Sequence, residues 1–194
     1  MTTKILKNVL IVLTAITLFS FDMPNGWHKA GDDPESYDMG IDKGAGQDGK
    51  NAATIKSIKK TKGFGTLMQS CIADKYLGKR IKMTGYVKSL DVKGWAGLWL
   101  RIDETNLYQK VLGFDNMVNR PIKKTTDWKK YEIVMDIPPN AYNLAYGALL
   151  VGQGQIWFSN INFEIVDDTV SLSKKDCNVC SKILNEPTNL SLEK

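Results

Sequence analysis

The chain has 194 residues, of which 43% are hydrophobic and 9% aromatic, and its formal net charge at pH 7 is +5. Its length and composition are typical of a single folded domain with a hydrophobic core. Its one histidine and three cysteines disfavour a Ser-His-Asp triad or a multi-histidine metal site. Lysine supplies all but three of the 26 positive residues, and the dense cluster at residues 56–62 contains no aromatic residue, which favours a solvated surface over a nucleic-acid partner.

Residues 1–20 have the organisation of a signal peptide. Lys4 and Lys7 form a basic start, and an apolar run of eleven residues follows from Val9 to Phe19. A membrane-spanning helix needs about 20 apolar residues, so this run is too short for an anchor. We therefore expect export to the periplasm, the cell surface or the medium, with membrane attachment only if the signal peptide stays uncleaved. The alternative is a buried N-terminal strand or helix.

Residues 25–50 are rich in glycine and aspartate, contain Pro34 and show little periodicity, which predicts long loops with one short strand. Within them, Gly44–Gly49 matches the G-x-G-x-x-G pattern of dinucleotide sites letter by letter. That motif has to follow a buried strand and to open a helix. Because neither context is present, we predict a turn here and no nucleotide cofactor.

From residue 52 to residue 166 the chain consists of short alternating runs. Apolar and polar side chains alternate over Ile81–Val87, Tyr131–Ile137 and Ile161–Ile165, and glycines separate these runs. Such alternation predicts strands, and only the stretch around Met68 to Tyr76 resembles a helix. We therefore predict an all-β sandwich over residues 21–168, with long N-terminal loops and at most one short helix.

The strand predicted from Lys93 to Asp103 is the most informative segment. Its core-facing side chains would be Ala96, Leu98, Leu100 and Ile102. Its other face would carry Trp95, Gly97, Trp99, Arg101 and Asp103. A sugar ring has an apolar face that stacks on an indole and hydroxyl groups that bond to arginine or aspartate, so this face is a candidate binding site. Gly97 would leave room for a ring. The alternative is that one tryptophan packs under a loop and that Arg101 and Asp103 form a structural pair.

A second candidate cluster follows shortly afterwards. Asp115, Asn116 and Arg120 supply hydrogen-bond donors and acceptors at a predicted loop edge. The same side chains are equally suited to bonding the backbone of a turn, and the sequence leaves both roles open.

The polar tail, residues 169–194, contains Cys177 and Cys180 as a C-x-x-C motif. It lacks the strand and helix context of a redox motif and the two further ligands of a zinc site. A local disulfide between Cys177 and Cys180 is therefore favoured over redox catalysis, and it would leave Cys71 buried and free. The tail itself is expected to be peripheral or disordered.

Several motifs resemble those of bacterial galactose-binding-like jelly-roll domains, and together they span residues 26–166. They are Gly63-Phe-Gly65 with Gln69, Tyr76-x-Gly78-Lys79-Arg80, Trp95-Ala-Gly97-Leu-Trp99-x-Arg101, Phe114-Asp115-Asn116-Met117, Thr125-Thr126-Asp127-Trp128-x-x-Tyr131, Gly147-Ala-Leu149-Leu150 and Gly152-x-Gly154-x-x-Trp157. Such domains are similar to carbohydrate-binding modules and occur beside exported hydrolases and esterases, and beside arabinose-regulator-type transcription factors. The resemblance implies a jelly roll whose concave face binds a ligand without catalysis. Related modules often hold a structural calcium ion, for which the aspartates of residues 25–50 would be the candidate ligands.

These observations favour a non-catalytic exported binding module for carbohydrate or another small polar ligand. The alternative is a structural or interaction protein of the cell envelope that uses the same aromatic face. A glycan-active hydrolase is less favoured, because the E-x-D-x-x-E signature of β-sandwich glycosidases is absent and Asp103 and Glu104 would face opposite sides of a strand. The sequence shows no helix-turn-helix beside the module, which disfavours a regulatory role on DNA, and it does not define the ligand or the oligomeric state.

Overall fold

The computed structural model describes residues 21–104 and 110–173, and this part of the chain is all-β. The strands are β1 (His28–Gly31), β2 (Tyr37–Asp42), β3 (Ala52–Ser57), β4 (Phe64–Ile72), β5 (Arg80–Asp103), β6 (Val111–Asp115), β7 (Ile122–Asp136), β8 (Asn143–Val151) and β9 (Gln155–Val166). Short 3₁₀ turns lie at η1 (Pro34–Ser36), η2 (Gln47–Gly49) and η3 (Asp74–Tyr76). The predicted signal peptide and the Cys177–Cys180 motif lie outside the described residues and stay predictions.

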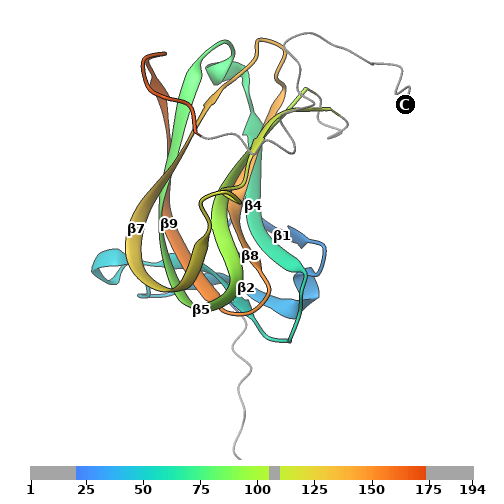
Figure 1. Cartoon of the computed structure of the whole chain (residues 1–194), viewed down its shortest axis with the longest axis vertical. Coiled ribbons are helices and arrows are strands. Elements are labelled where there is room, and N and C mark those ends of the chain that lie inside the picture. Colours follow the sequence, from blue (N-terminus) through green and yellow to red (C-terminus); the bar gives the residue numbers. More distant parts are fainter. Residues whose placement is uncertain (1–20, 105–109, 174–194) are drawn as a thin grey trace, which may run out of the picture.

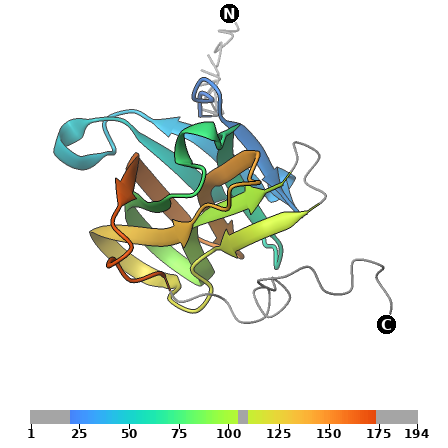
Figure 2. The same ribbon diagram turned by 90° about the horizontal axis from the view of Figure 1, so that it is seen from above.

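The strands form two antiparallel layers that share the long strand β5 (Figure 1). Layer A contains, in order, β1, β4, β8, the second half of β5 (residues 95–103) and β6. Layer B contains β2, β3, β9, the first half of β5 (residues 80–90) and β7. Figure 2 shows the two layers from above, facing each other. Because β5 runs through both layers, the sandwich is one continuous hydrogen-bonded sheet folded on itself.

The bend of β5 lies between its two halves. The register with β7 shifts between Val87 and Ser89 and again on either side of Val92. Asp91 adopts a left-handed φ of 51°, a conformation that aspartate tolerates better than most residues. Gly94 lies so close to the carbonyl of Val151 that a Cβ atom there would collide with it. Register shifts of this kind bend a strand and increase its twist, which lets β5 cross from layer B to layer A.

Alternate side chains of the strands fill the space between the layers. On the second half of β5 the predicted core set is confirmed, since Ala96, Leu98, Leu100 and Ile102 each have 0% exposure. Layer B contributes Ile81, Met83, Ile156 and Phe158 to the same cluster. Burial of each large apolar side chain stabilises the fold by roughly 1.5–3 kcal/mol. The all-β sandwich expected from the sequence is therefore confirmed.

Two local expectations were wrong. Residues 25–50 contain two strands, β1 and β2, where long loops with one short strand were expected. The stretch from Met68 onward continues strand β4 as far as Ile72, and only η3 has a helical turn. The reason is tertiary: β4 has β1 on one side and β8 on the other, and these neighbours supply hydrogen bonds that outweigh the weak local preference.

Other expectations for the surface are confirmed. The glycine-rich match at Gly44–Gly49 lies in the connection between β2 and β3 and includes η2, so it is a turn. The lysine cluster at residues 56–62 lies at the end of β3 and in the following loop, and its lysines are exposed. Cys71 forms no disulfide with any residue that the structure describes. The expectation that it is buried was wrong, since it is only half-buried, and this burial raises the pKa of its thiol. No helix within residues 21–104 and 110–173 is long and apolar enough to cross a membrane.

Residues 167–173, which include the described start of the predicted tail, lie against the edge strand β7. The guanidinium of Arg80 binds the carboxylate of Asp136 and donates to the backbone carbonyls of Asp168 and Val170. Further along, Ser173 and Val134 exchange hydrogen bonds through the Ser173 amide and hydroxyl groups. This stretch therefore covers part of the edge of layer B.

Candidate binding site

A groove of about 580 Å³ lies on the outer face of layer A, the face turned away from layer B. Strand pairing places its lining residues in rows across β1, β4, β8 and β5. One row contains His28, Met68, Gly147 and Trp99. The next rows contain Ala30, Thr66, Leu149 and Gly97, and then Phe64, Val151 and Trp95. The predicted face of β5 thus becomes part of the floor of a groove that spans most of the layer.

Trp99 forms the floor of this groove. It lies opposite Gly147 on β8, and its indole Nε1 donates a 2.8 Å hydrogen bond to the Thr66 hydroxyl on β4. The Thr66 hydroxyl in turn donates to the carbonyl of Ala148 at 2.7 Å. Phe114 of β6 contacts the indole edge to face, with the ring centres 6.4 Å apart. Only 6% of Trp99 is exposed, so its position is fixed by packing and by this hydrogen-bond chain.

Trp95 lies at the other end of the same face of β5 and is half-buried. It packs against the small apolar cluster of the groove, whose buried members are Met68, Trp99, Ala145 and Leu149. The cluster is separate from the main core between the layers. Trp95 therefore offers part of its indole to solvent, whereas Trp99 offers little.

Arg101 lines the groove beside Trp99, and Asp103 holds it from behind. The Arg101 Nε lies 3.0 Å from Asp103 Oδ1, and the Arg101 side chain is 28% exposed. The carboxylate of Asp103 is fully buried and also accepts a 3.1 Å hydrogen bond from Asn143 Nδ2. Asp103 therefore orients the guanidinium and does not itself line the groove. Arg101 and Asp103 therefore form the structural pair that the sequence left open as an alternative. Arg101 nevertheless stays exposed to the groove.

The second predicted cluster forms a closed loop beside the groove. Arg120 binds Asp115 through two hydrogen bonds of 3.0 and 2.7 Å, and the Asp115 carboxylate also accepts from the amide of Met117. Asn116 accepts from the amide of Val118 and lines the groove. Of this cluster only Asn116 reaches the groove, while Asp115 and Arg120 fix the loop that carries it.

The expectation that Gly97 leaves room for a ligand ring was wrong. The loop at Asn116 and Met117 occupies that space, and a Cβ atom on Gly97 would lie 2.8 Å from the Asn116 carbonyl oxygen. The glycine therefore allows the loop to approach β5, and the loop narrows the groove at this point.

The residues supplied by the other strands were missed in the sequence. They include His28, Phe64, Thr66, Met68 and Leu149. The alternation of Phe64, Thr66 and Met68 is a strand signal, but the expectation of a helix around Met68 concealed it. For β1 and β8 no local signal exists, because their place beside β5 follows only from the sheet order.

The electrostatic character of the groove is simple. Arg101 is its charged lining residue, and the imidazole of His28 is exposed at the edge of the sheet. No acidic side chain lines the groove within the described part of the chain. The remaining surface is mostly aromatic or aliphatic, so the site suits a ligand with apolar faces and a polar group near Arg101.

The two aspartates that follow β1 bond to other parts of the chain and form no calcium-binding cluster with other described side chains. Ca²⁺ takes six or more oxygen ligands, several of them carboxylates. The carboxylate of Asp32 accepts from the amide of Phe64, and that of Asp33 accepts from the Thr61 hydroxyl, which lowers the pKa of Asp33. Among residues 21–104 and 110–173 there is no group of three or more side chains suited to hold a metal ion.

Solved structures share the fold of this chain. The CBM22-1 xylan-binding domain of Paenibacillus barcinonensis Xyn10C is 14% identical, with a TM-score of 0.53 over 76% of this chain and 90% of that domain. The CBM22-1–GH10 modules of Clostridium thermocellum xylanase 10B, complexed with xylohexaose, are 11% identical, with a TM-score of 0.53 over 73% of this chain and 26% of that one. The enzymatically active domain of tailspike protein 4 of bacteriophage CBA120 gives the same TM-score at 14% identity, over 73% of this chain and 20% of that one. The jelly-roll β-sandwich expected from the sequence is thereby confirmed, as a fold that carbohydrate-binding modules share.

One curated protein is similar in sequence. It is described as an uncharacterized HTH-type transcriptional regulator, YbfP, of Bacillus subtilis, and it is 39% identical over 170 residues, or 87% of this chain. The chain spans 56% of the length of that relative. No family model matches the chain.

Proposed function

We propose that this chain is a non-catalytic carbohydrate-binding module whose ligand lies in the groove on the outer face of layer A. The observation that carries the proposal is the groove itself, where Trp95, Trp99 and Phe114 lie beside Arg101. The apolar face of a sugar stacks on aromatic rings, and a guanidinium donates to hydroxyl or carboxylate oxygens. The jelly-roll fold shared with xylan-binding domains supports the same conclusion.

Binding is a better match to the groove than hydrolysis. A glycosidase needs two carboxyl groups about 5–10 Å apart on either side of the scissile bond. Asp103 is fully buried behind Arg101, and Asp115 is held by Arg120. Neither carboxylate lines the groove, and this arrangement supports a role in recognition.

Export is part of the proposal and depends on residues 1–20. Their basic start and short apolar run support passage through a membrane, and an exported module of this kind would meet polysaccharides in the periplasm, at the cell surface or outside the cell. The test is to measure by mass spectrometry whether the secreted chain is shorter than the precursor by about the first 20 residues. An unprocessed chain that stays in the cytoplasm contradicts it.

The test of the function is affinity electrophoresis and calorimetry against soluble xylan, galactan, glucan and polygalacturonate. Trp95→Ala is the informative variant, because Trp95 is half-buried whereas Trp99 belongs to the packed floor. We expect this change to weaken polysaccharide binding at least about tenfold, or about 1.4 kcal/mol, with little change in melting temperature. Trp128→Ala is the matched control, since Trp128 is a half-buried tryptophan of β7 in layer B. Equal affinity of Trp95→Ala and the unaltered chain contradicts the proposal.

A second candidate is a protein-contact surface in the same groove, favoured by its apolar residues Phe64, Met68 and Leu149. It predicts that no polysaccharide binds and that the chain forms a complex or oligomer in which Trp95 is shielded. Light scattering over a range of concentrations, together with quenching of tryptophan fluorescence by iodide, separates the two candidates.

A further inference from the structure

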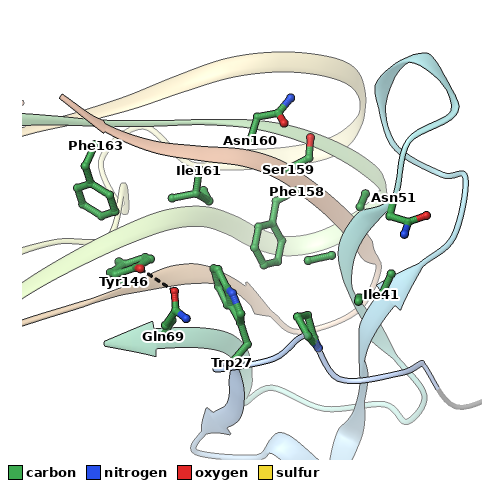
Figure 3. Close-up of a pocket in the computed structure, with 13 residues that line it drawn as sticks. Trp27, Ile41, Asn51, Gln69, Tyr146, Phe158, Ser159, Asn160, Ile161 and Phe163 are labelled. Atoms are coloured by element: carbon green, nitrogen blue, oxygen red, sulfur yellow. Dashed lines mark hydrogen bonds between the residues drawn. The ribbon is translucent and has the colours of Figure 1, made fainter. Parts of the chain in front are cut away.

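A second cavity, of about 480 Å³, opens at the edge of the sandwich between layers A and B (Figure 3). Its walls come from the segment before β1, from β3, from β4 and β8 of layer A, and from β9 of layer B. Ligand pockets generally measure about 300–1,000 Å³, so this cleft is large enough for a small molecule.

Four aromatic rings surround the cleft, and Figure 3 shows them facing its interior. Trp27 meets Tyr146 edge to face at 6.0 Å and lies tilted against Phe158 at 5.7 Å. On the far side, Tyr146 and Phe163 are 4.7 Å apart at an interplanar angle of 71°. Trp27 is held at the mouth by a turn in which its amide donates to the carbonyl of Pro24.

A hydrogen-bonded pair of polar side chains lies on the layer A wall of the cleft. On layer A, the Tyr146 hydroxyl donates a 2.7 Å hydrogen bond to Gln69 Oε1, which orients the amide of Gln69 (Figure 3). On β9, the buried hydroxyl of Ser159 lies on the side of the strand turned away from Gln69 and Tyr146 (Figure 3). The side-chain amide of Gln69 is therefore a polar group that a ligand in the cleft can reach.

The cleft differs from the groove in its charge. Its described lining residues are all uncharged, and its polar ones are amides and hydroxyls. A charged ligand placed there would lose its hydration without gaining an opposite charge, which is strongly unfavourable. The cleft therefore selects uncharged ligands, whereas the groove contains Arg101.

We propose that this cleft is a second binding site, for an uncharged ring with an apolar face and a rim of hydroxyl groups, namely the pyranose unit of a neutral glycan. Its apolar face would stack against the aromatic walls, and a hydroxyl group would bond to the amide of Gln69. Stacking of this kind discriminates little between epimers, so several neutral pyranoses are expected to bind.

The two sites lie on opposite faces of the same pair of strands. Met68 and Leu149 face the groove, while their strand neighbours Gln69 and Tyr146 face the cleft. A substitution in the cleft therefore leaves the groove lining in place, and the proposal can fail or succeed independently of the proposed function.

The test is a titration of the ¹⁵N-labelled chain with methyl β-D-xylopyranoside, methyl β-D-glucopyranoside and methyl β-D-galactopyranoside, followed by NMR. We expect at least one of these glycosides to give saturable shifts of the Gln69 side-chain amide signal and of the Trp27 indole signal. The two signals are assigned by their absence in Gln69→Leu and Trp27→Ala. The shift of the Gln69 amide should be lost in Trp27→Ala, and the shift of the Trp27 indole should be lost in Gln69→Leu. Both shifts should be kept in the groove variant Trp95→Ala. The matched charged probe, methyl β-D-glucuronide, should leave both signals in place.

Three results overturn the proposal: no saturable shift with any neutral pyranoside, equal shifts with the glucuronide, or loss of the cleft shifts in Trp95→Ala. Since Trp27→Ala removes packing from the core, its amide spectrum is compared with that of the unaltered chain. If that spectrum shows loss of the fold, Gln69→Leu decides, because it keeps the size of the side chain and removes only its hydrogen-bonding groups.

Discussion

Asp103 acts on the groove through Arg101. It is fully buried, it pairs with Arg101 at 3.0 Å, and it accepts from Asn143. A sequence pattern that places Arg101 and Asp103 on one face cannot separate their roles, because both residues share the same strand periodicity. Burial separates them, and it makes Asp103 a positioning residue for the guanidinium.

We predict that Asp103→Asn lowers both stability and affinity for polysaccharide. Removal of one partner from a fully buried pair costs roughly 3–5 kcal/mol, and the loss here should be smaller because water reaches Arg101. Urea denaturation and calorimetry measure the two effects. In the double variant with Arg101→Gln, the two substitutions should be less than additive, since both break one interaction. Strict additivity would contradict a coupled pair.

Tyr37 provides a second prediction, for the alkaline range. Its hydroxyl bonds to the carbonyl oxygens of Gly63 and Gly152, at 2.7 and 2.9 Å, and burial raises its pKa from the usual 10.0 to about 12. The neutral phenol is therefore favoured in the folded state. Its contribution to stability is complete below pH 10 and declines as the pH rises towards about 12.

Tyr37→Phe should accordingly cost about 0.5–1.5 kcal/mol of unfolding free energy at neutral pH. Above pH 10 the variant should lose stability less steeply than the unaltered chain, because it has no phenol to ionise there. Denaturant unfolding at several pH values measures both. Identical pH profiles of the two proteins would show that Tyr37 does not titrate in this way.

At the scale of elements, the loop between β6 and β7 shapes the groove. Asp115 and Arg120 close the loop at its base, and the carbonyl of Asn116 fills the space above Gly97. Because the side chain of Asp115 also caps the amide of Met117, the carboxylate organises both ends of the turn. The loop is therefore a fixed part of the groove wall.

We predict that Arg120→Gln speeds hydrogen exchange over residues 116–119 and weakens binding of polysaccharide, without unfolding the sandwich. Arg120 is 31% exposed but Asp115 is nearly buried, so the loss of global stability should stay below the roughly 3–5 kcal/mol of a fully buried pair. Arg80→Gln is the matched control, since Arg80 makes a similar two-point contact with Asp136 far from the groove. Equal effects of both variants on binding would contradict a role of the loop.

At the scale of the whole molecule, β5 makes the two layers interdependent. Its first half pairs with β7 and β9, and its second half pairs with β8 and β6, so neither layer keeps its central strand if the other unfolds. The core between the layers is also shared.

We therefore predict a single cooperative unfolding transition. Tryptophan fluorescence, which reports on Trp95 and Trp99 in layer A and on Trp157 in layer B, should coincide with circular dichroism as urea is raised. Separate midpoints for the two signals would show that the layers unfold independently.

The sequence by itself determined the periodic features of this protein. The alternation along β5 predicted both the buried set from Ala96 to Ile102 and the shared face of Trp95, Trp99 and Arg101, because side chains of a strand alternate whatever surrounds it. The same alternation in the other strands predicted the all-β sandwich. It failed at Met68, where alternation and helical preference conflict and pairing with β1 and β8 decides.

Only the tertiary structure decided which strands lie beside β5, and with them the shape of the site. Gly147 lies opposite Trp99, and Thr66 receives its indole hydrogen bond, although both come from other parts of the chain. Burial of Asp103 and the loop over Gly97 likewise depend on partners that no local pattern specifies. Periodicity is a local property of the backbone, whereas a groove or a buried charge results from contacts between segments that are distant in sequence.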